Sequence, residues 1–423
     1  MKVNYLFIFA LFMCVMGLPV SISAQNVLTW QDCLNEAIGN NPELISAAEE
    51  IKQVKSDKGV AISTALPQIS SQLSGKTAKS SAGNKQDTYS YTITGKQLLF
   101  DGFKTAADVK AAAKTLTAQE YNYLVTSSNI RLNLRVAFVA LLRAQELTSL
   151  TEDIAERRKQ NLELVQLRYD AGREHKGALL TARADLAQAE FEVIQAKRNL
   201  SLAQRELIKE LGWEKKAPVE VKGAFVILQG GSITPDFESL ADNTPLLKEL
   251  IAKKEAKRFS YDSAKADFLP EIYLNTSFGR THSHWPPQDE QWSAGLTLTL
   301  PVFEGGSRIA RVSKAESQLK QASADERSGR DSVLVTLEET WKDFQDAIDI
   351  VSVKEKFLNA AQERAKIASA QYSQGLIAFD DWIIIEDNLV NAKKNYLDAQ
   401  ANLLVYEADW IQAKGGTLEY VQK

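Results

Sequence analysis

An internal repeat with a period of 203 residues runs through most of this 423-residue chain. The offset holds without a gap over about 170 positions, and self-similarity at a fixed period is the sequence signature of a repeated structural unit. The chain is therefore predicted to be two copies of one unit. Matching segments include Asn40-x-Pro42-x-Leu44 with Asn243-x-Pro245-x-Leu247, Leu66-Pro67-x-Ile69 with Leu269-Pro270-x-Ile272, Phe100-x-Gly102 with Phe303-x-Gly305, and Tyr169-x-x-Gly172 with Tyr372-x-x-Gly375.

The repeat predicts the domain organisation of the whole chain. Each unit is expected to contain helix, strand, loop, strand, long helix and return helix, in that order. The boundaries are 1–24 for a signal peptide, 25–212 for the first structural repeat, 213–236 for a linker, 237–415 for the second structural repeat and 416–423 for a C-terminal tail. Strands are expected at about 66–80, 88–100, 269–281 and 291–303, and helical hairpins at 102–211 and 305–414.

The first 24 residues have the pattern of a secretory signal. Lys2 is the only charge, the run from Tyr5 to Val20 is apolar, and 21–24 offers small residues for cleavage. The rival interpretation, a transmembrane anchor, needs a longer run. Cys14 follows Met13, where lipidation would require a small residue, so no lipid anchor is predicted. Cys33 is then the only cysteine of the mature chain, and we expect an inert core thiol.

Composition excludes several classes of function. Lys and Arg total 50 against 54 for Asp and Glu, so the net charge of −4 disfavours a nucleic-acid binder, which needs a basic face. Three His and two Cys are too few for a multi-ligand metal site or a disulfide scaffold. The sequence offers no nucleophile–base set, metal cluster or phosphate loop, so an enzyme is the least supported class and no cofactor is expected.

The predicted strands alternate between apolar and polar residues. This period of two suits a membrane barrel with an apolar outer face and a wet lumen, and the segment lengths are near those of tilted spanning strands. The alternative is two soluble hairpins, each with one buried face. The residues expected to face the membrane are Ile69, Leu73, Tyr89, Tyr91, Ile93, Ile272, Leu274, Phe278, Trp292, Leu296 and Leu298.

The helical segments show sustained heptads, which indicate coiled coils. No proline occurs between Gly102 and Tyr169 or between Gly305 and Tyr372, so each segment can form one helix of roughly 100 Å at 1.5 Å per residue. The seam positions are Leu179, Ala182, Leu186, Ala189, Val193, Ala196, Leu200, Ala203 and Leu207 in the first unit, and Trp382, Ile385, Leu389, Ala392, Tyr396, Ala399, Leu403, Tyr406 and Trp410 in the second.

The number of strands predicts an oligomer. Two hairpins give four strands, which cannot close around a lumen, and open sheet edges are not tolerated in lipid. Eight strands would leave an interior filled by side chains, so twelve or more are expected for a channel. Three chains would supply twelve strands and twelve helices.

At this point the residues resemble the TolC-like outer membrane efflux family, over nearly all of the mature chain. The matching features are Leu28-Thr29-Trp30 to Asn41-Pro42-Glu43-Leu44, both Leu-Pro-x-Ile strand starts, Leu300-Pro301-Val302-Phe303-Glu304-Gly305-Gly306, and the tip sequences Arg168-Tyr169-Asp170-Ala171-Gly172 and Gln371-Tyr372-Ser373-Gln374-Gly375-Leu376. Their order, spacing and duplication together carry the resemblance.

The resemblance implies an α+β membrane protein: a homotrimer whose 12-stranded β-barrel stands on a long α-helical coiled-coil tunnel. It implies the outer membrane of a Gram-negative bacterium, with the helices in the periplasm. The implied function is the exit duct of a tripartite efflux or type I secretion system. The implied partners are outer membrane lipid, a periplasmic adaptor (membrane fusion) protein and an inner-membrane pump of RND or ABC type.

The family also implies a gate at the closed end of the tunnel. Its latch tyrosine and the acid that accepts its hydrogen bond fall on Tyr372 and Asp170, and its latch arginine falls on Ile377. Arg173 is the candidate to replace that arginine. Ordinary polarity at a helix tip is the competing interpretation.

A ring of aspartates narrows the family's entrance. One position matches Asp381, with Asp380 beside it, and the second falls on Ile384, with Glu386 and Asp387 about a turn away. Carboxylates gathered by three-fold symmetry would attract cations. The competing interpretation is a solvated helix start, where Asp is favoured in any case.

Adaptor docking is expected at the helix tips, where the family exposes an apolar contact. The residues are Gly172, Arg173, Gly375, Leu376 and Ile377, with Glu174 beside the more polar first tip.

Two features of the predicted hairpins have simpler explanations. His282-x-His284 offers two metal ligands, but a plain surface loop is the more probable structure. Trp285, Trp292, Tyr89 and Tyr91 suit an aromatic girdle, or ordinary packing within the hairpins.

Two further function classes compete with a conduit. A trimeric surface adhesin also pools four strands per chain, but its strands would lie together at the C-terminus, whereas helices separate the hairpins here. A periplasmic coiled-coil scaffold predicts no membrane association. The sequence identifies neither the exported substrate nor the class of pump.

Overall fold

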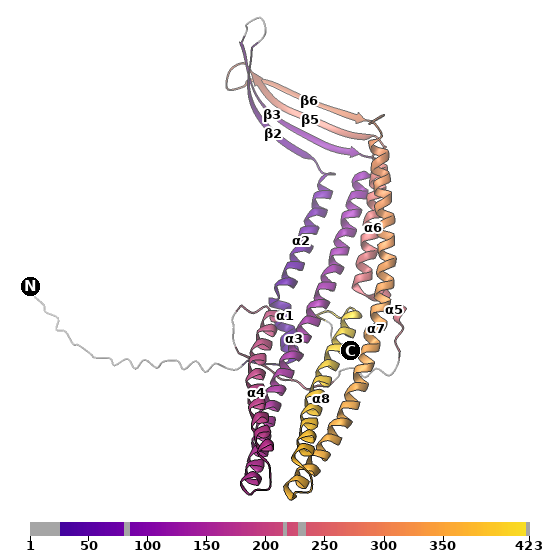
Figure 1. Cartoon of the computed structure of the whole chain (residues 1–423). Coiled ribbons are helices and arrows are strands. Elements are labelled where there is room, and N and C mark those ends of the chain that lie inside the picture. Colours follow the sequence, from indigo (N-terminus) through magenta and orange to yellow (C-terminus); the bar gives the residue numbers. More distant parts are fainter. Residues whose placement is uncertain (1–25, 80–84, 215–217, 227–233, 420–423) are drawn as a thin grey trace, which may run out of the picture.

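The computed structural model describes residues 26–79, 85–214, 218–226 and 234–419, so the predicted signal peptide and Cys14 lie outside the described residues. A long helical part carries one sheet at its end (Figure 1). The elements are β1 (Asn26–Leu28), α1 (Trp30–Asn40), α2 (Pro42–Ser63), β2 (Gln68–Lys79), β3 (Lys85–Phe100), α3 (Lys104–Asp170), α4 (Lys176–Leu211), β4 (Val219–Val221), α5 (Phe237–Asn243), α6 (Pro245–Ala266), β5 (Glu271–His282), β6 (Asp289–Thr299), α7 (Ser307–Gln374) and α8 (Phe379–Ala413).

The repeat in the sequence is a repeat in the structure. The helices α6, α7 and α8 and the strand β5 each begin 203 residues after α2, α3, α4 and β2. Proline opens both α2 and α6, where its missing N–H is harmless. Before α2, the Asn41 side chain accepts hydrogen bonds from the N–H groups of Glu43 (3.0 Å) and Leu44 (3.2 Å).

The sheet is antiparallel, in the order β2-β3-β5-β6. Its register sets Leu73 opposite Tyr91 and Ile93 opposite Phe278. Residues directly opposite each other share a face, so the eleven apolar positions predicted to face the membrane lie together on one face. Most of these side chains, Trp292 and Leu296 among them, are exposed in the chain. The alternative of hairpins with a buried apolar face is therefore wrong for this chain.

The other face of the sheet is polar and is held together by side-chain hydrogen bonds across the strands. Ser70 bonds Thr94 at 2.7 Å, and Ser277 bonds Ser293 at 2.8 Å. Within the described chain, β2 and β6 each pair on one side only. The sheet thus has one apolar face, one polar face and two open edges.

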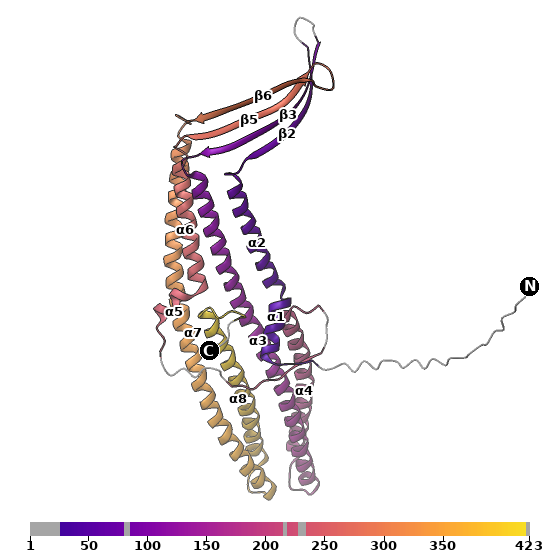
Figure 2. The same cartoon turned by 180° about the vertical axis from the view of Figure 1, so that it is seen from behind.

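The helix α3 is central and contacts α1, α2, α4, α6 and α8 (Figures 1 and 2). The predicted heptad positions of α4 and α8 are buried or half-buried, which confirms the coiled-coil seams, with one exception. Tyr406 is exposed because this part of α8 packs through Leu404 and Ala408 as well, whose faces turn toward α3.

Short elements form a layer around the middle of the helices. The predicted linker 213–236 contributes β4, which pairs in parallel with β1, so this segment is more than a connection. The C-terminal tail is tied down too, because the N–H of Leu418 donates to Ser127 Oγ on α3 at 3.0 Å. Cys33 is fully buried in the same core, as expected of an inert thiol.

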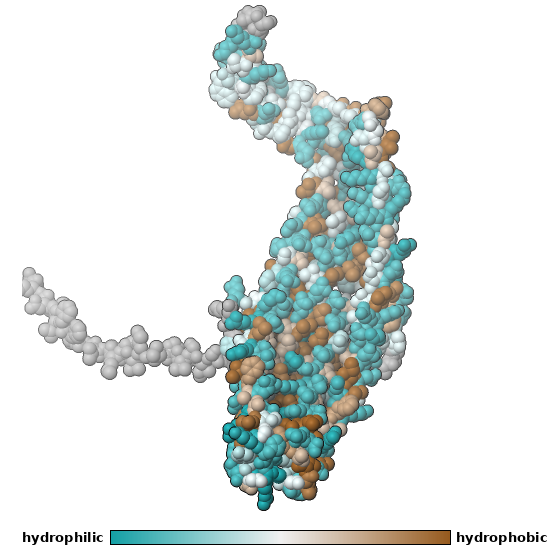
Figure 3. Space-filling view, viewed as in Figure 1, coloured by the Kyte–Doolittle hydropathy of each residue, from teal (hydrophilic) through white to brown (hydrophobic). Residues whose placement is uncertain are grey.

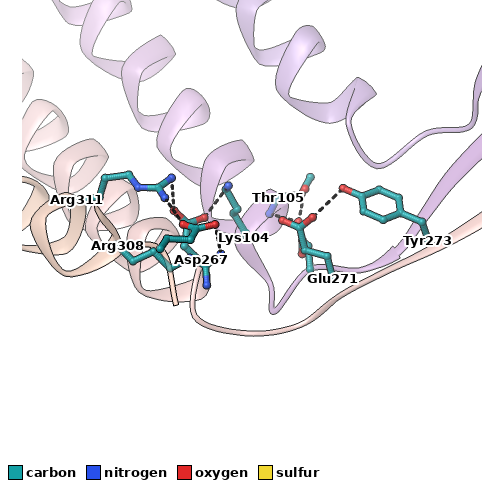
Figure 4. A network of polar contacts seen from close by, with 9 residues as sticks. Lys104, Thr105, Asp267, Glu271, Tyr273, Arg308 and Arg311 are labelled. Carbon is teal, nitrogen blue, oxygen red and sulfur yellow. Dashed lines mark hydrogen bonds and ion pairs between the residues drawn. The ribbon is translucent and has the colours of Figure 1, made fainter. Parts of the chain in front are cut away.

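The sheet joins the helices through a polar network around the first turns of α3 and α7 (Figure 4). Asp267 accepts contacts from Lys104 Nζ (2.7 Å) and Arg311 Nη1 (3.4 Å), so one carboxylate ties the end of α6 to both long helices. Strand β6 ends at Thr299, before the predicted limit of 303, because Pro301 has no N–H for a ladder. Among the described helices, none is long and apolar enough to cross a bilayer.

Candidate gate at the helix tips

Two turns lie side by side at the end of the molecule farthest from the sheet (Figures 1 and 2). The first joins α3 to α4 and contains Gly172 at φ +69°, and the second joins α7 to α8 and contains Gly375 at φ +77°. Both glycines adopt the left-handed conformation that ends a helix. Residues predicted for the gate and for adaptor docking therefore gather in one place.

Tyr372 is the centre of this site, but its partner differs from the predicted one. The Tyr372 hydroxyl donates to Glu174 Oε2 at 2.8 Å, not to Asp170. Asp170 ends α3 and accepts from Gln166, one turn earlier on the same helix, at 2.8 Å. Glu174 lies four residues later, in the turn, and only there does a carboxylate reach across to α7.

Arg168 supplies the arginine of the site, where the sequence suggested Arg173. Its Nη1 donates to the carbonyl oxygen of Tyr372 at 2.6 Å, and its guanidinium lies 4.6 Å from the centre of the Tyr372 ring. Its Nε is 3.9 Å from Glu174 Oε2. Arg173 is exposed instead.

Aromatic packing fixes the position of the Tyr372 ring. The Tyr372 ring stacks on Trp382 with centroids 4.2 Å apart and planes 12° from parallel, and Phe379 contacts both rings edge-on. Burial, followed by the hydrogen bond to Glu174, raises the pKa of Tyr372, so the phenol stays protonated and remains a donor. The buried cluster draws on all four helices and consists of Val165, Ala178, Leu179, Ala182, Ala368, Tyr372, Phe379 and Trp382.

The two acids predicted for the entrance ring are accessible at the start of α8. Asp380 and Asp381 lie in the first turn of α8 and are exposed, where the helix dipole favours carboxylates. Glu386 and Asp387 turn away from this position toward α3, where each meets an arginine. The ring itself stays a prediction that rests on Asp380 and Asp381.

An arginine ladder between α3 and α8 was missed by the sequence reasoning. Arg157 binds the buried Glu386 with two hydrogen bonds of 2.6 and 2.8 Å, and Arg158 pairs with Asp387. Two heptads before Arg157, Arg143 pairs with Asp398 at 2.6 Å. Arginine at heptad spacing on α3 was the signal that could have predicted this contact.

Beside the ladder, α3, α4 and α8 enclose a polar cavity of about 240 Å³ lined by Arg158, Asp185, Glu192, Asp387 and Lys394, with five further residues. Burial raises the pKa of Asp185, and Arg158 partly offsets the effect. These pairs join the first helical hairpin to the second within one chain.

The docking positions are largely accessible. Gly172, Arg173, Gly375 and Leu376 are exposed at the two tips. Ile377 is half-buried against the aromatic cluster, so the expected exposed apolar pair is reduced to Leu376. Docking itself stays a prediction.

The histidine pair of the second hairpin gains no further metal ligand. His282 Nδ1 lies 3.1 Å from Asp289 Oδ2, and the ring of His284 is 5.7 Å from that of His282. In the described ranges, no group of three His, Cys, Asp or Glu side chains is arranged to hold a metal ion. Trp285, in the loop between β5 and β6, contacts Tyr89 of β3 edge-on, so this contact joins the two hairpins and is not packing within one of them.

Comparison with known proteins shows which family and which solved structures this chain is similar to. The profile of the family described as outer membrane efflux protein matches residues 33–213 and 237–416. The outer membrane efflux protein BepC of Brucella suis biovar 1 is 23% identical, covering 89% of this chain and 86% of that protein. The outer membrane protein TolC of Escherichia coli is 21% identical, covering 90% and 80%. The crystal structure of the outer membrane protein VceC from Vibrio cholerae superposes with a TM-score of 0.80 at 20% identity, covering 92% of this chain and 97% of that one.

Proposed function

The chain belongs to the outer membrane efflux protein family, and from this premise we propose that it is the passive exit duct of a tripartite efflux or type I secretion system. It acts in the outer membrane of a Gram-negative bacterium, with its helices in the periplasm. Substrates leave the periplasm through it without being transformed, so its residues serve passage and gating.

The sheet is the observation that carries this proposal. Its apolar face suits lipid, its hydroxyl-lined face suits a water-filled lumen, and its two edges are open. A sheet edge in lipid must be paired, so β6 of one copy is expected to pair with β2 of the next. Three copies close a barrel of twelve strands.

Exposed apolar stripes on the helices also support a closed ring of three copies. Since α3 contacts α8 within the chain, α4 and α7 stand at opposite sides of the helical part. In a closed ring, α4 of one copy meets α7 of its neighbour. Both carry exposed apolar residues at heptad spacing: Leu180, Ala184, Ala187, Phe191 and Ile194 on α4, and Ile350, Val353, Phe357, Ala360 and Ile367 on α7.

The tips are the gate of this duct. Tyr372, Glu174 and Arg168 hold the α7–α8 turn against the α3–α4 turn and thereby favour the closed entrance. Asp380 and Asp381 of three copies give the entrance a preference for cations. A periplasmic adaptor engages Gly172, Arg173, Gly375 and Leu376 and links the duct to an inner-membrane pump of RND or ABC type.

The proposal is tested by the native mass and conductance of the mature protein extracted from outer membranes in detergent. A trimer that forms ion-conducting pores in planar lipid bilayers is the expected result. A monomer or dimer in the soluble periplasmic fraction, without pores, would contradict it.

A further inference from the structure

The two histidines of the second hairpin are held by the elements around them. His282 is the last residue of β5, where it lies opposite Tyr89 of β3, and Asp289 is the first residue of β6. His284 follows His282 by two residues, and the next residue, Trp285, packs edge-on against Tyr89. The pair therefore stands on a strand end and on a loop that is anchored to the neighbouring hairpin.

Each imidazole already uses its Nδ1 atom. His282 Nδ1 lies 3.1 Å from Asp289 Oδ2, and because an ionised carboxylate only accepts, the ring nitrogen donates. His284 Nδ1 lies 3.0 Å from Ser283 Oγ. A hydrogen bond to one ring nitrogen selects the tautomer and leaves the other nitrogen to bind a metal ion. In both rings the nitrogen that remains for a ligand is Nε2.

The spacing of the two rings fits a single ion. The ring centres of His282 and His284 are 5.7 Å apart, with the planes inclined by 44°. A metal–nitrogen bond of about 2.0–2.1 Å sets each ring centre about 3.2 Å from the ion, so two imidazoles on one ion have centres at most about 6.4 Å apart. The observed separation is within this limit, so both rings can reach one ion.

The surroundings of the pair suit a cation from solution. The side chains of His284 and Asp289 are exposed, and Arg280 lies 3.9 Å from Glu290, so the positive charge on the adjacent rung of the sheet has an acidic partner. The loop lies at the end of the sheet farthest from the helices (Figure 1), where the surface consists mostly of hydrophilic and intermediate residues (Figure 3). An ion can therefore enter without opening the fold.

We propose that His282 and His284 bind one divalent transition-metal ion through their Nε2 atoms, with Asp289 orienting the His282 ring. Two protein ligands are fewer than the four of a structural zinc site, so water completes the coordination. Imidazole suits Cu²⁺, Ni²⁺ and Zn²⁺, of which Cu²⁺ binds tightest, whereas Mg²⁺ and Ca²⁺ prefer oxygen ligands. The site needs only the hairpin, and in the proposed channel it lies at the exterior end.

The test titrates Cu²⁺ into the untagged mature protein in detergent, with calorimetry to count ions and pulsed EPR to count imidazoles on the ion. We expect one Cu²⁺ per chain, bound by two imidazoles. His282→Asn and His284→Asn should each weaken binding and leave one imidazole. His175→Asn is the matched control, because the third histidine of the chain caps α4 at the opposite end of the molecule, where asparagine caps equally well.

Asp289→Asn tests the positioning role separately. It keeps both ligands, so the two-imidazole spectrum should persist while the affinity for Cu²⁺ falls about 10- to 100-fold, as for other partners of metal-bound histidines. An unchanged affinity would remove Asp289 from the site.

Two results would overturn the metal site itself. One is binding that persists when His282→Asn and His284→Asn are combined, and the other is a single imidazole on the ion in the wild type. Ions are counted per chain, so the outcome is independent of whether the protein forms a trimer or conducts.

Discussion

At the scale of single residues, the repeat lets equivalent positions be compared within one chain. Tyr372 and Tyr169 occupy the same position of the two units, yet Tyr372 is fully buried and Tyr169 is exposed. Glu174, which accepts the hydrogen bond of Tyr372, corresponds to Ile377 in the second unit. The second tip therefore supplies the hydrogen-bond donor, Tyr372, and the first tip supplies the acceptor, Glu174. This difference gives each gate variant a control on the same protein.

Tyr372→Phe is expected to loosen the entrance. The change leaves the Glu174 carboxylate without its phenol donor, which costs the closed tip about 1–3 kcal/mol. Single-channel recording in planar bilayers should show a higher mean conductance. Tyr169→Phe is the matched control and should conduct like the wild type, whereas equal effects from both changes would contradict a specific role for Tyr372.

Two helix-ending glycines differ in the space around them. A Cβ at Gly172 would meet nothing within 4 Å, whereas a Cβ at Gly212 would overlap the carbonyl oxygen of Asn40. Both positions have positive φ, so Gly172→Ala should cost about 1 kcal/mol for the left-handed conformation alone. Gly212→Ala should cost several kcal/mol more because backbone must move. Thermal unfolding measures the loss of stability in each variant, and similar losses would contradict the predicted clash at Gly212.

Cys33 is expected to be chemically silent in the folded protein. Burial, with smaller contributions from Asp32 and Glu36, raises the pKa of Cys33 to about 12. The folded state then holds the thiol proton above pH 9, where the unfolded state releases it, so stability falls as pH rises from about 9 toward 12. Cys33→Ala should flatten that decline. Ellman's reagent should label the wild type at pH 8 only after denaturation, and labelling of the native protein would contradict this account.

At the scale of elements, two kinds of seam hold the helices together. Within each hairpin the seam is an apolar heptad, with alanine at alternate positions that allows close approach. Between the hairpins, α3 and α8 meet through apolar contacts of Val139 with Ala401 and Leu404, and also through three arginines with acidic partners, Arg143, Arg157 and Arg158. Separating the helices at an apolar seam exposes apolar side chains to water, which is costly. Paired charged side chains, in contrast, can bind water or new partners when the helices move. If the tips act as the proposed gate, we expect the charged stretch of the α3–α8 contact to be the part that rearranges when it opens.

Glu386→Gln tests the ladder. Glu386 is 1% exposed and holds Arg157 by two hydrogen bonds, while water can reach Arg157, which is 37% exposed, so the change should cost about 1–3 kcal/mol. Urea unfolding of the trimer measures the change. Glu363→Gln, at an exposed position of α7, should be neutral. The double change Arg157→Met with Glu386→Leu should cost less than Glu386→Gln, and a larger cost would contradict the charge argument.

At the scale of the whole molecule, one chain by itself neither closes its sheet nor covers the apolar stripes of its helices. Its sheet has two open edges, its helices carry apolar stripes on α4 and α7, and its polar sheet face needs water. In the proposed trimer, each feature is satisfied by copies of the same chain around a central axis. Because each chain contains two units, a three-fold assembly places six similar units around the duct. The proposed duct can therefore form only when copies of the chain assemble.

Phe191→Glu on α4 and Phe357→Glu on α7 are expected to weaken the trimer. Each introduces a carboxylate into a stripe that meets a neighbouring copy, where burial of an unpaired charge is costly. Native mass in detergent should shift from trimer toward monomer. Gln160→Glu, at an exposed position of α3, introduces the same single negative charge and should leave the trimer intact. A stable trimer in both phenylalanine variants would place the seam elsewhere.

The sequence by itself determined the repeat, the element order, the face of each strand and the heptad seams. These are local periodicities, and a period of 2 or 3.5 residues is set by backbone geometry wherever the segment lies. Only the tertiary structure decided that Tyr372 bonds Glu174 instead of Asp170, that Arg168 takes the place suggested for Arg173, and that residues 219–221 form a strand. Those contacts depend on the axial shift and rotation of one helical hairpin against the other. Asp170 ends α3 and Glu174 lies in the turn after it, so the acid that reaches Tyr372 is decided by the path of this turn and by the placement of the second hairpin, neither of which follows from periodicity.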